Sequence, residues 1–475
     1  MTEDARTAGL RARVAELMPQ AKSDLAHLVS FKSVADPRQF PPEECDRAAQ
    51  WVADAFAAAG LTTVGLHETP DGSTAVVAAR PAPDGAPTVL LYCHYDVQPP
   101  MDEGAWRTPP WELTERDGRW YGRGSADCKG NIVMHLTALR ALGPDLPLGV
   151  TLVAEGSEEQ GTGGLERFVE AGPDLLRADA IVIGDCGNFA AGVPTLTETL
   201  RGNVNVLVTI ETLAGPLHSG MFGGPAPDAL AALIQVLASL RDKRGNTTID
   251  GLPNDQVWPG VQYPSEQFHA DAAVLRDVEL TGDGTVADML WARPALTVLG
   301  IDAPPVVGSA AAVPAIARAR LNLRIPPGTD PAQAYRALVG RPPRRAHAVA
   351  RQGDHRAGRH GSAVPVPHRR ACTCRDGGGA GRVLWTTRDH SGAGRIHPAV
   401  QRLLRDRVGA AGRSPSAARA GPSEGEAAAY PDAEIMLLGV EEPKCLIHAP
   451  NESVDPKEIE HMALAEALFL ATYAG

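Results

Sequence analysis

The stretch Thr88-Val-Leu-Leu-Tyr-Cys93 is a short apolar run with Pro87 before it and polar residues after it. Runs of this kind are typical of strands that are buried on both faces of a sheet. Similar runs lie nearby, and between them apolar residues recur every three or four positions, as in helices. Because strands alternate with helices, we predict an α/β fold, with a mixed, largely parallel sheet sandwiched by helices. The predicted strands are residues 73–79, 88–93, 150–154 and 180–184, and the predicted helices are 8–29, 42–59, 130–142 and 164–171.

A second unit begins near residue 200. The predicted elements there are strand 203–211, helix 227–240, strand 296–300, strand 313–325 and helix 331–339. A closing strand after this series would give a small ferredoxin-like α+β domain, inserted into the larger one as a lid. We expect that strand near residues 342–355, but no apolar run occurs there.

Residues 341–428 differ from the rest of the chain in composition. They contain seventeen arginines, no lysine and only ten Val, Leu and Ile residues. So few apolar residues can hardly build a core. One hypothesis is a genuine basic insert that binds an acidic partner. The other is an out-of-frame reading of a GC-rich gene, whose shifted codons yield Arg, Ala, Gly, Pro and His. We favour the frame shift, because ordered sequence resumes abruptly at Tyr430-Pro-Asp-Ala-Glu-Ile-Met-Leu-Leu-Gly-Val440.

Length, charge and cysteine content narrow the class of protein. A chain of 475 residues suggests two or three domains. Its net charge of −12 argues against nucleic acid as the main partner, since phosphate binding needs a basic surface. No apolar run reaches the roughly 18 residues of a membrane span, and the acidic start Met1-Thr-Glu-Asp4 is unlike a secretory signal. The seven scattered cysteines suit a reducing compartment. We therefore expect a cytoplasmic enzyme without a membrane partner.

Two polar groups stand where a ligand site would form in such a fold. His94 follows the strand 88–93, and Asp96 stands two positions on, where its carboxylate could hold the other ring N–H of the imidazole. Taken alone, His94 is more simply explained as a core residue whose ring nitrogens are hydrogen-bonded within the protein than as a metal ligand. Asp127 lies among glycines in Gly122-Arg-Gly-Ser-Ala-Asp-Cys-Lys-Gly130. It could bring two carboxylate oxygens to a crowded site, or it could cap a helix.

Further acidic and imidazole side chains follow other strands. Glu158 and Glu159 lie just beyond the strand 150–154, Asp185 ends the strand 180–184, and His448 follows the last apolar run. Two adjacent glutamates cannot both face one metal ion, so one could bind metal while the other acts as a base. The pair could equally be a solvated acidic turn. Taken together, two imidazoles and three carboxylates suit two divalent ions that share a bridging carboxylate, which is a known way to activate water.

These motifs together resemble the M20 family of metallopeptidases, and within it the cytosolic, carnosinase-like dipeptidases. The resemblance covers about residues 1–340 and 429–475. It implies a catalytic domain in two parts, 1–199 and 429–475, a lid and dimerisation domain at 200–340, and an anomalous segment at 341–428. The matching segments are Cys93-His-Tyr-Asp-Val-Gln-Pro99, Gly124-Ser-Ala-Asp-Cys-Lys-Gly130, Glu158-Glu-Gln-Gly-Thr-Gly-Gly164, Leu217-His-Ser-Gly-Met-Phe-Gly-Gly224 and His448-Ala-Pro-Asn-Glu452.

The resemblance also implies a role for individual residues. Asp96 would orient His94, and Glu158 would be the general base that takes a proton from water and passes it to the leaving amine. The family often has a cis peptide after the bridging Asp, here the bond Asp127–Cys128. The ions would be zinc, with manganese or cobalt as alternatives. Five residues would hold them: His94 and Asp185 one ion, Glu159 and His448 the other, and Asp127 both.

Two residues of the predicted lid would contact the substrate. His218 is the oxyanion candidate, and in the dipeptidases the equivalent His reaches across a dimer interface to the substrate of the other subunit. The resemblance therefore implies a homodimer formed through the lid. Arg324 ends an alternating strand and would bind the carboxylate at the C-terminus of a small peptide substrate. The alternative to this role is that Arg324 is simply an exposed arginine at the edge of a strand.

One expected motif is missing. The family has a Gly-Gly-Ser-Ile-Pro segment before the last metal ligand, and Arg419-Ala-Gly-Pro-Ser423 stands there instead. If the printed chain is real, we expect metal binding to survive and turnover to be impaired. The leading hypothesis is a dipeptidase, and its close rival is an N-acyl amino acid deacylase of the acetylornithine or succinyl-diaminopimelate type. A non-catalytic metal-binding protein is disfavoured because Glu158 is present. A module that binds partners through a basic segment would rest wholly on residues 341–428.

Overall fold

The computed structural model describes residues 3–144, 146–193, 195, 197, 200–340 and 433–473, and the backbone of 382–390. The chain forms two compact units. The first contains the described parts of Met1–Thr199 and Gly421–Gly475, and the second contains those of Leu200–Ser391. No helix among these residues combines the length and apolar character needed to cross a membrane.

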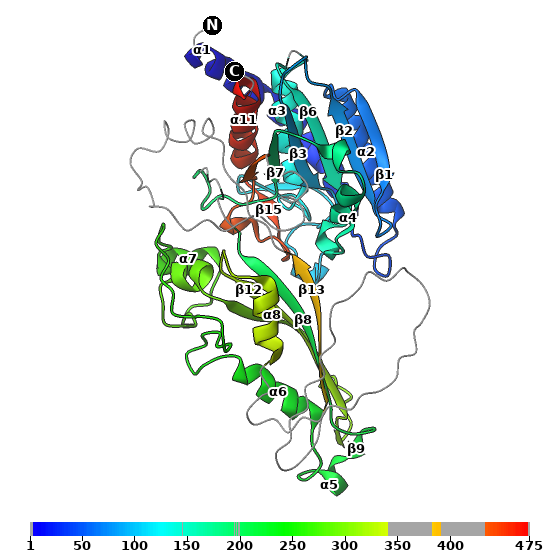
Figure 1. Ribbon diagram of the computed structural model, residues 1–475, viewed down its shortest axis with the longest axis vertical. Helices are drawn as coiled ribbons and strands as arrows, with labels where there is room; N and C mark the ends of the chain where they lie inside the picture. Colours follow the sequence, from blue (N-terminus) through cyan, green and yellow to red (C-terminus); the bar gives the residue numbers. More distant parts are fainter. Residues whose placement is uncertain are drawn as a thin grey trace. The chain divides into compact units, whose positions relative to one another are not determined.

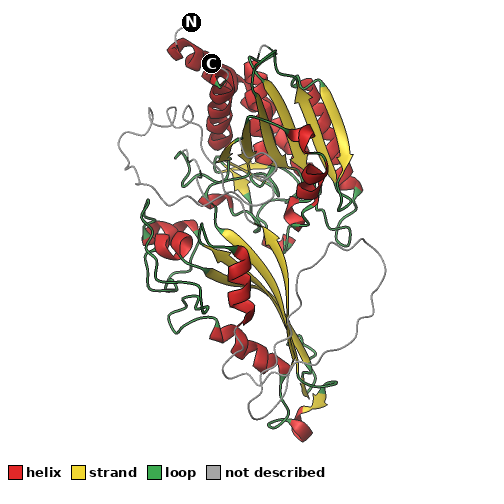
Figure 2. Ribbon diagram, in the orientation of Figure 1, coloured by secondary structure: helices red, strands yellow, loops and turns green. Residues whose placement is uncertain are grey.

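A six-stranded sheet forms the centre of the first unit (Figure 2). Its order is β1-β2-β6-β3-β7-β14. The four strands β6, β3, β7 and β14 run parallel, whereas β1 and β2 pair antiparallel at one edge. The sheet is therefore mixed and largely parallel, as the sequence predicts. Its strands are β1 (Thr63–Glu68), β2 (Thr74–Arg80), β3 (Thr88–His94), β6 (Gly149–Glu155), β7 (Ala180–Gly184) and β14 (Glu434–Leu438).

Helices cover both faces of this sheet (Figure 1). Side chains alternate between the faces, so that Leu91 of β3 enters the larger core and Leu90 the smaller one. Burying one such leucine contributes about 1.5–3 kcal/mol. The larger core lies under α1 (Glu3–Ser30), α2 (Glu43–Ala58), α3 (Lys129–Leu142) and α11 (Pro456–Thr472), and the smaller one lies under α4 (Gly164–Ala171).

Short elements complete the first unit. A small three-stranded sheet joins β4 (Thr114–Arg116), β5 (Arg119–Tyr121) and β15 (Ser453–Val454). The short 3-10 helices in the described part of this unit are η1 (Glu103–Ala105), η2 (Glu158–Gln160), η3 (Pro173–Leu176) and η5 (Pro443–Cys445). The C-terminal helix α11 packs against α1 and α3, so the first and last helices of the described chain lie side by side (Figure 1).

The second unit is built on a four-stranded sheet of order β10-β12-β8-β13, in which every neighbouring pair is antiparallel. Helices α6 and α8 connect its strands and pack on one apolar core with them. The strands are β8 (Gly202–Glu211), β10 (Ala295–Asp302), β12 (Ile316–Ile325) and β13 (Arg382–His390), and the helices are α6 (Ala229–Ser239) and α8 (Pro331–Gly340). The remaining elements are β9 (Leu217–His218), α5 (Ser219–Phe222), α7 (Ser265–Asp271), η4 (Asp288–Ala292) and β11 (Ala312–Val313).

The position expected for the closing strand needs correction. Residues 342–355 lie outside the described residues, and the strand that pairs with β8 is β13 at 382–390. The segment Val383-Leu-Trp-Thr-Thr387 is rich in strand-forming residue types, a local signal that the arginine-rich surroundings hide. The rest of 341–428 lies outside the described residues, so the frame shift stays a hypothesis.

Candidate functional site

Parallel strands place the candidate residues at one edge of the large sheet. The carboxyl ends of β3, β6, β7 and β14 meet there, because these strands run in the same direction. Each of these strands is followed by candidate residues: His94 ends β3, Glu158 and Glu159 lie in η2 after β6, Asp185 follows β7, and His448 lies in the loop after β14. Asp127 joins them from the loop before α3.

The carboxylate of Asp127 lies between two imidazoles. Its Oδ1 is 3.1 Å from Nε2 of His94, and its Oδ2 is 3.0 Å from Nε2 of His448. The same nitrogen of His448 is 3.2 Å from Oε2 of Glu159. On the other side, Nε2 of His94 is 3.4 Å from Oδ1 of Asp185. The five side chains therefore form one continuous cluster with Asp127 at its centre.

The two adjacent glutamates point to different parts of this cluster. Glu159 contacts His448, whereas Oε2 of Glu158 is 4.0 Å from Nε2 of His94. Asp96 holds the turn that separates them, because its two oxygens accept the backbone N–H groups of Glu158 and Glu159, each at 3.1 Å. The same carboxylate is 3.3 Å from Nδ1 of His94. Asp96 thus fixes the imidazole and both glutamates at once.

Charges in the cluster shift the pKa of its members. Burial opposes ionisation of Asp127, but hydrogen bonds from His448 and His94 hold its pKa well below the usual value. Burial alone would lower the pKa of His448, whereas its bonds to Asp127 and Glu159 raise it to about 10. Burial raises the pKa of Glu158 to about 8, although the charge of His94 opposes this. The raised pKa of His448 reflects the two carboxylates beside it, and a bound cation would offset the same negative charge.

The donor atoms fit a metal centre. Two groups could each hold an ion: His94 with Cys128 and Asp185, and Asp127 with Glu159 and His448. Oε1 of Glu159 is buried without a hydrogen-bond partner among the described residues, as expected for a ligand oxygen. Imidazole and carboxylate donors together suit zinc, manganese or cobalt.

Cys128 is a member of the first group, but its surroundings favour the neutral thiol. Its Sγ donates a hydrogen bond to the carbonyl oxygen of Gly184 at 3.0 Å. Burial raises the pKa of this thiol well above its usual value, which disfavours the thiolate that a metal would bind. The bond Asp127–Cys128 is cis, as the resemblance predicts.

Some residues that support the site were not among the candidates. Asp71 accepts hydrogen bonds from the Ser157 hydroxyl at 2.8 Å and from the Thr162 hydroxyl, which secures the turn around η2. Gln98 donates from Nε2 to Oε2 of Glu159 at 2.8 Å. The sequence around Asp71, Thr-Pro-Asp-Gly, signals only a turn. Gln98 lies in the segment Cys93–Pro99, whose resemblance to the family motif is the feature of the sequence that could have identified it.

His218 and Arg324 lie in the second unit and are not members of this cluster. His218 ends β9 and is exposed. Arg324 lies on β12 opposite Asn203 and is also exposed. Near it, burial and the charge of Arg324 lower the pKa of Arg201 to about 10. Two guanidinium groups therefore share one region of the second unit, which favours binding of an anion.

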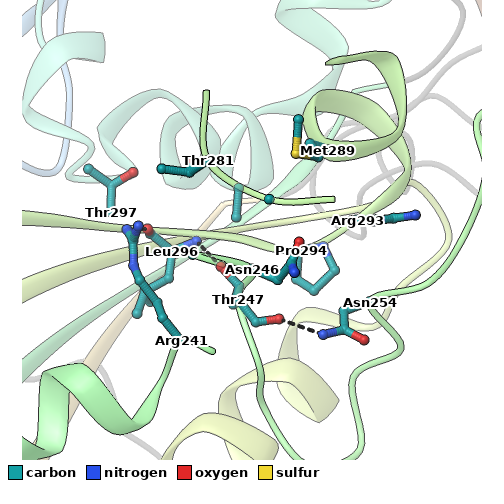
Figure 3. Close-up of a pocket in the computed structure, with 13 residues that line it drawn as sticks. Arg241, Asn246, Thr247, Asn254, Thr281, Met289, Arg293, Pro294, Leu296 and Thr297 are labelled. Carbon is teal, nitrogen blue, oxygen red and sulfur yellow. Dashed lines mark hydrogen bonds between the residues drawn. The ribbon is translucent and has the colours of Figure 1, made fainter. Parts of the chain in front are cut away.

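A cavity of about 250 Å³ lies elsewhere in the second unit. Figure 3 shows Thr247 at its wall, where it accepts a hydrogen bond from Asn254 and contacts the backbone of Leu296. None of the candidate residues lines it. The two arginines there, Arg241 and Arg293, donate to backbone oxygens of the protein itself. The lining of this cavity therefore shares no residue with the cluster around Asp127.

Comparisons with known proteins match this chain to one family of peptidases. The profile of "Peptidase family M20/M25/M40" matches residues 90–472. The chain is 41% identical over 470 residues to a cysteinylglycine-S-conjugate dipeptidase of Corynebacterium striatum, covering 95% of this chain and 94% of that protein. It is 32% identical over 289 residues to the Beta-Ala-His dipeptidase of Rattus norvegicus, covering 56% and 58%.

A solved structure shares the fold. Human carnosine dipeptidase 1 superposes with a TM-score of 0.74 at 22% sequence identity, and the match covers 98% of each chain. The family profile spans most of this chain, and the Corynebacterium relative matches nearly all of it. The chain therefore belongs to peptidase family M20/M25/M40 and is a hydrolase of peptide bonds.

Proposed function

We propose that the chain is a metallodipeptidase whose acidic cluster holds two divalent cations. His94 and Asp185 would hold one ion, Glu159 and His448 the other, and Asp127 would bridge them. The observation that carries this proposal is the carboxylate of Asp127, which has one oxygen at each of two imidazoles. Zinc is the proposed metal, with manganese or cobalt as alternatives, because the proposed ligands are imidazoles and carboxylates.

Glu158 is the proposed general base. Two bound cations would polarise the scissile carbonyl and make a bound water more acidic. Glu158 lies beside the proposed ligands without bonding to Asp127, and its side chain is 42% exposed, so its carboxylate can reach a water. It would take a proton from that water and then deliver it to the leaving amine. Asp96 would keep Glu158 in place through the backbone of η2.

The second unit would act as a ferredoxin-like lid that binds the substrate. Its strand order and its two connecting helices support this proposal. Arg324, with Arg201 nearby, would bind the free carboxylate of a dipeptide. His218 would supply the oxyanion contact to the partner subunit of a homodimer formed through this lid. Exposure of His218 among the described residues is compatible with such a contact.

The proposed substrates are dipeptides with a free C-terminal carboxylate, and the names of the relatives suggest cysteinylglycine-S-conjugate, Cys-Gly and β-Ala-His types. Nothing observed favours the N-acyl amino acid deacylase as a second function. A cytoplasmic location is also proposed, because the five described cysteines are free thiols. Residues 341–428 are proposed to be a frame-shifted segment that impairs turnover.

The first test compares substrates after metal removal and reloading. Metal-free protein should be inactive, and activity should return with zinc, manganese or cobalt ions. We expect release of both amino acids from Cys-Gly or β-Ala-His, and little hydrolysis of N-acetyl or N-succinyl amino acids, measured by amine release. Faster cleavage of the acyl substrates would establish the deacylase instead. Binding of metal without any hydrolysis would leave a metal-binding protein.

The second test concerns carboxylate recognition by Arg324. Arg324→Met should raise KM for a dipeptide about 10–100-fold, because a hydrogen bond to a charged group is worth about 1.5–3 kcal/mol. The matched control is Arg318→Met, since Arg318 is an exposed arginine on the same strand and makes a long, 4.0 Å contact with Asp302. A dipeptide amide should be hydrolysed equally by the wild type and by Arg324→Met. An unchanged KM for the free dipeptide would exclude this role.

A further inference from the structure

One buried carboxylate connects the loop of Asp127 with the loop of His448. Glu452 is fully buried and lies four positions after His448. Its Oε1 accepts hydrogen bonds from the backbone N–H groups of Ala126 and Asp127, each at 3.1 Å. Its Oε2 accepts from the backbone N–H of Gly124 at 3.0 Å. Three N–H groups of one loop thus converge on one side chain that is more than 320 positions away.

Arg123 completes this arrangement. Its Nη1 donates to Oε2 of Glu452 at 2.6 Å, and both side chains are 1% exposed. Its Nη2 donates to the carbonyl oxygens of Pro99 and Ala449, each at 3.2 Å. Ala449 is the neighbour of His448, so the guanidinium holds the second loop directly. The ring of Trp106 lies 5.4 Å from this cation, within the range of a stabilising cation–π contact.

The backbone before Asp127 is shaped for this contact. Gly124 has φ +79°, a conformation that L side chains rarely adopt, and a Cβ there would approach Val97 and Lys129 too closely. Successive N–H groups in such a turn form a concave site for an anion. In this chain the anion is the side chain of Glu452, and one of the three donors, Asp127, is itself the proposed bridging ligand.

We propose that Glu452, paired with Arg123, is a positioning residue that sets the distance between Asp127 and His448 and thereby the affinity for metal. The proposal rests on the proposed metal site. Groups that orient metal ligands typically change metal affinity about 10–100-fold when they are altered. A carboxylate that accepts four hydrogen bonds inside the protein cannot be replaced by an amide without turning a donor toward another donor.

The test replaces Glu452 with glutamine. Glu452→Gln keeps the size of the side chain, but its NH₂ group is a donor and would face either the guanidinium of Arg123 or the N–H groups of the loop, which are donors too. We expect the affinity for Zn²⁺ alone, measured by competition with a chelator, to fall about 10–100-fold. The fall in kcat should exceed any change in KM, since the substrate-binding residues proposed in the second unit are untouched. Melting of the metal-free protein measures the purely structural cost.

Asp288→Asn is the matched control. Asp288 is a buried carboxylate of the second unit that accepts backbone N–H groups from Trp258 at 2.6 Å and Thr285 at 2.9 Å. This control should lower the melting temperature without changing zinc affinity. If Glu452→Gln does not fold, Arg123→Lys serves instead. Lysine keeps the positive charge but lacks the Nη2 group that donates to the carbonyl oxygens of Pro99 and Ala449.

The outcomes are distinguishable. Zinc affinity that falls in Glu452→Gln or Arg123→Lys but not in Asp288→Asn supports the proposal. Wild-type affinity in Glu452→Gln and in Arg123→Lys, or an equal loss in Asp288→Asn, would overturn it, since the carboxylate would then serve stability alone. Failure of the wild type to bind two equivalents of zinc would instead refute the proposed metal site itself.

Discussion

Replacing Glu158 with glutamine should lower kcat for dipeptide hydrolysis by about 10²–10⁴-fold, the usual range for loss of a general acid–base group. The metal content of the variant should match that of the wild type. Both expectations follow from the position of Glu158, which lies beside His94 at 4.0 Å and does not contact Asp127 or His448 at bonding distance. An amide keeps the shape of the side chain but cannot take a proton from water.

The pH profile gives a second measurement on the same variant. Burial raises the pKa of Glu158 to about 8 in the protein without cations, and bound cations would lower it again. A base works only when it is ionised, so kcat/KM should rise with pH through a pKa below about 8. The acidic limb of the profile should disappear in Glu158→Gln. Glu158→Asp should recover part of the activity, because it restores the carboxylate one methylene further away.

A matched control separates this effect from a general loss of charge. Glu170 is an exposed glutamate of α4 in the same unit, and Glu170→Gln should behave as the wild type. Metal content is measured by elemental analysis on all variants. Retention of more than about one-tenth of wild-type kcat in Glu158→Gln would exclude its role as base, and loss of metal in that variant would make it a ligand.

The sequence predicts most of the large sheet because its strands carry local signals. The strand at 180–184 and the helix at 164–171 coincide with β7 and α4, since each is a compact apolar or amphipathic run with clear ends. The sequence does not predict the strand β1, because its side chains are mostly exposed and weakly apolar. The helix α11 is also absent from the predicted elements, although Asp455 caps it and Pro456 begins it.

The site shows where local patterns stop being informative. His94 and Asp185 could be proposed from their positions after apolar runs, since parallel strands bring such ends together. Glu452 could not, because its meaning depends on Arg123 and three N–H groups that lie more than 320 positions away. From the local sequence alone, a buried glutamate in a polar motif can be a metal ligand or an acceptor of backbone hydrogen bonds from a distant loop. No neighbouring residue distinguishes these two roles.

Replacing Asp127 with asparagine should weaken binding of both metal ions. Its two oxygens face two different imidazoles at 3.1 and 3.0 Å, so an amide removes a ligand oxygen from one side and the negative charge from both. The loss should exceed the 10–100-fold typical of an orienting group, because Asp127 itself is the proposed ligand. Dipeptide hydrolysis should fall with metal content, and excess zinc should restore it only in part.

Asp185→Asn is the comparison that distinguishes a bridging from a terminal ligand. Asp185 contacts His94 alone among the two imidazoles, so this variant should weaken one equivalent of zinc and leave the other close to its wild-type affinity. Titration of metal-free protein with zinc resolves the two equivalents. Identical titrations for Asp127→Asn and Asp185→Asn, with one equivalent lost in each, would contradict the bridging role of Asp127.

The metal-free protein offers an independent measurement through its pH-dependent stability. The pKa of His448 is raised to about 10, mainly by hydrogen bonds to Asp127 and Glu159 that outweigh the opposing effect of burial. A raised imidazole pKa stabilises the fold fully below the unfolded value of about 6.5, and this contribution is lost as pH rises towards 10. The depressed pKa of Asp127 adds stability above about 4, which is lost in acid. Melting temperatures of the metal-free wild type should therefore fall between pH 6.5 and 10 by more than those of Asp127→Asn, since the variant lacks the charge that holds the proton on His448. Parallel melting curves for the two proteins across this range would show that Asp127 and His448 do not interact as the structure places them.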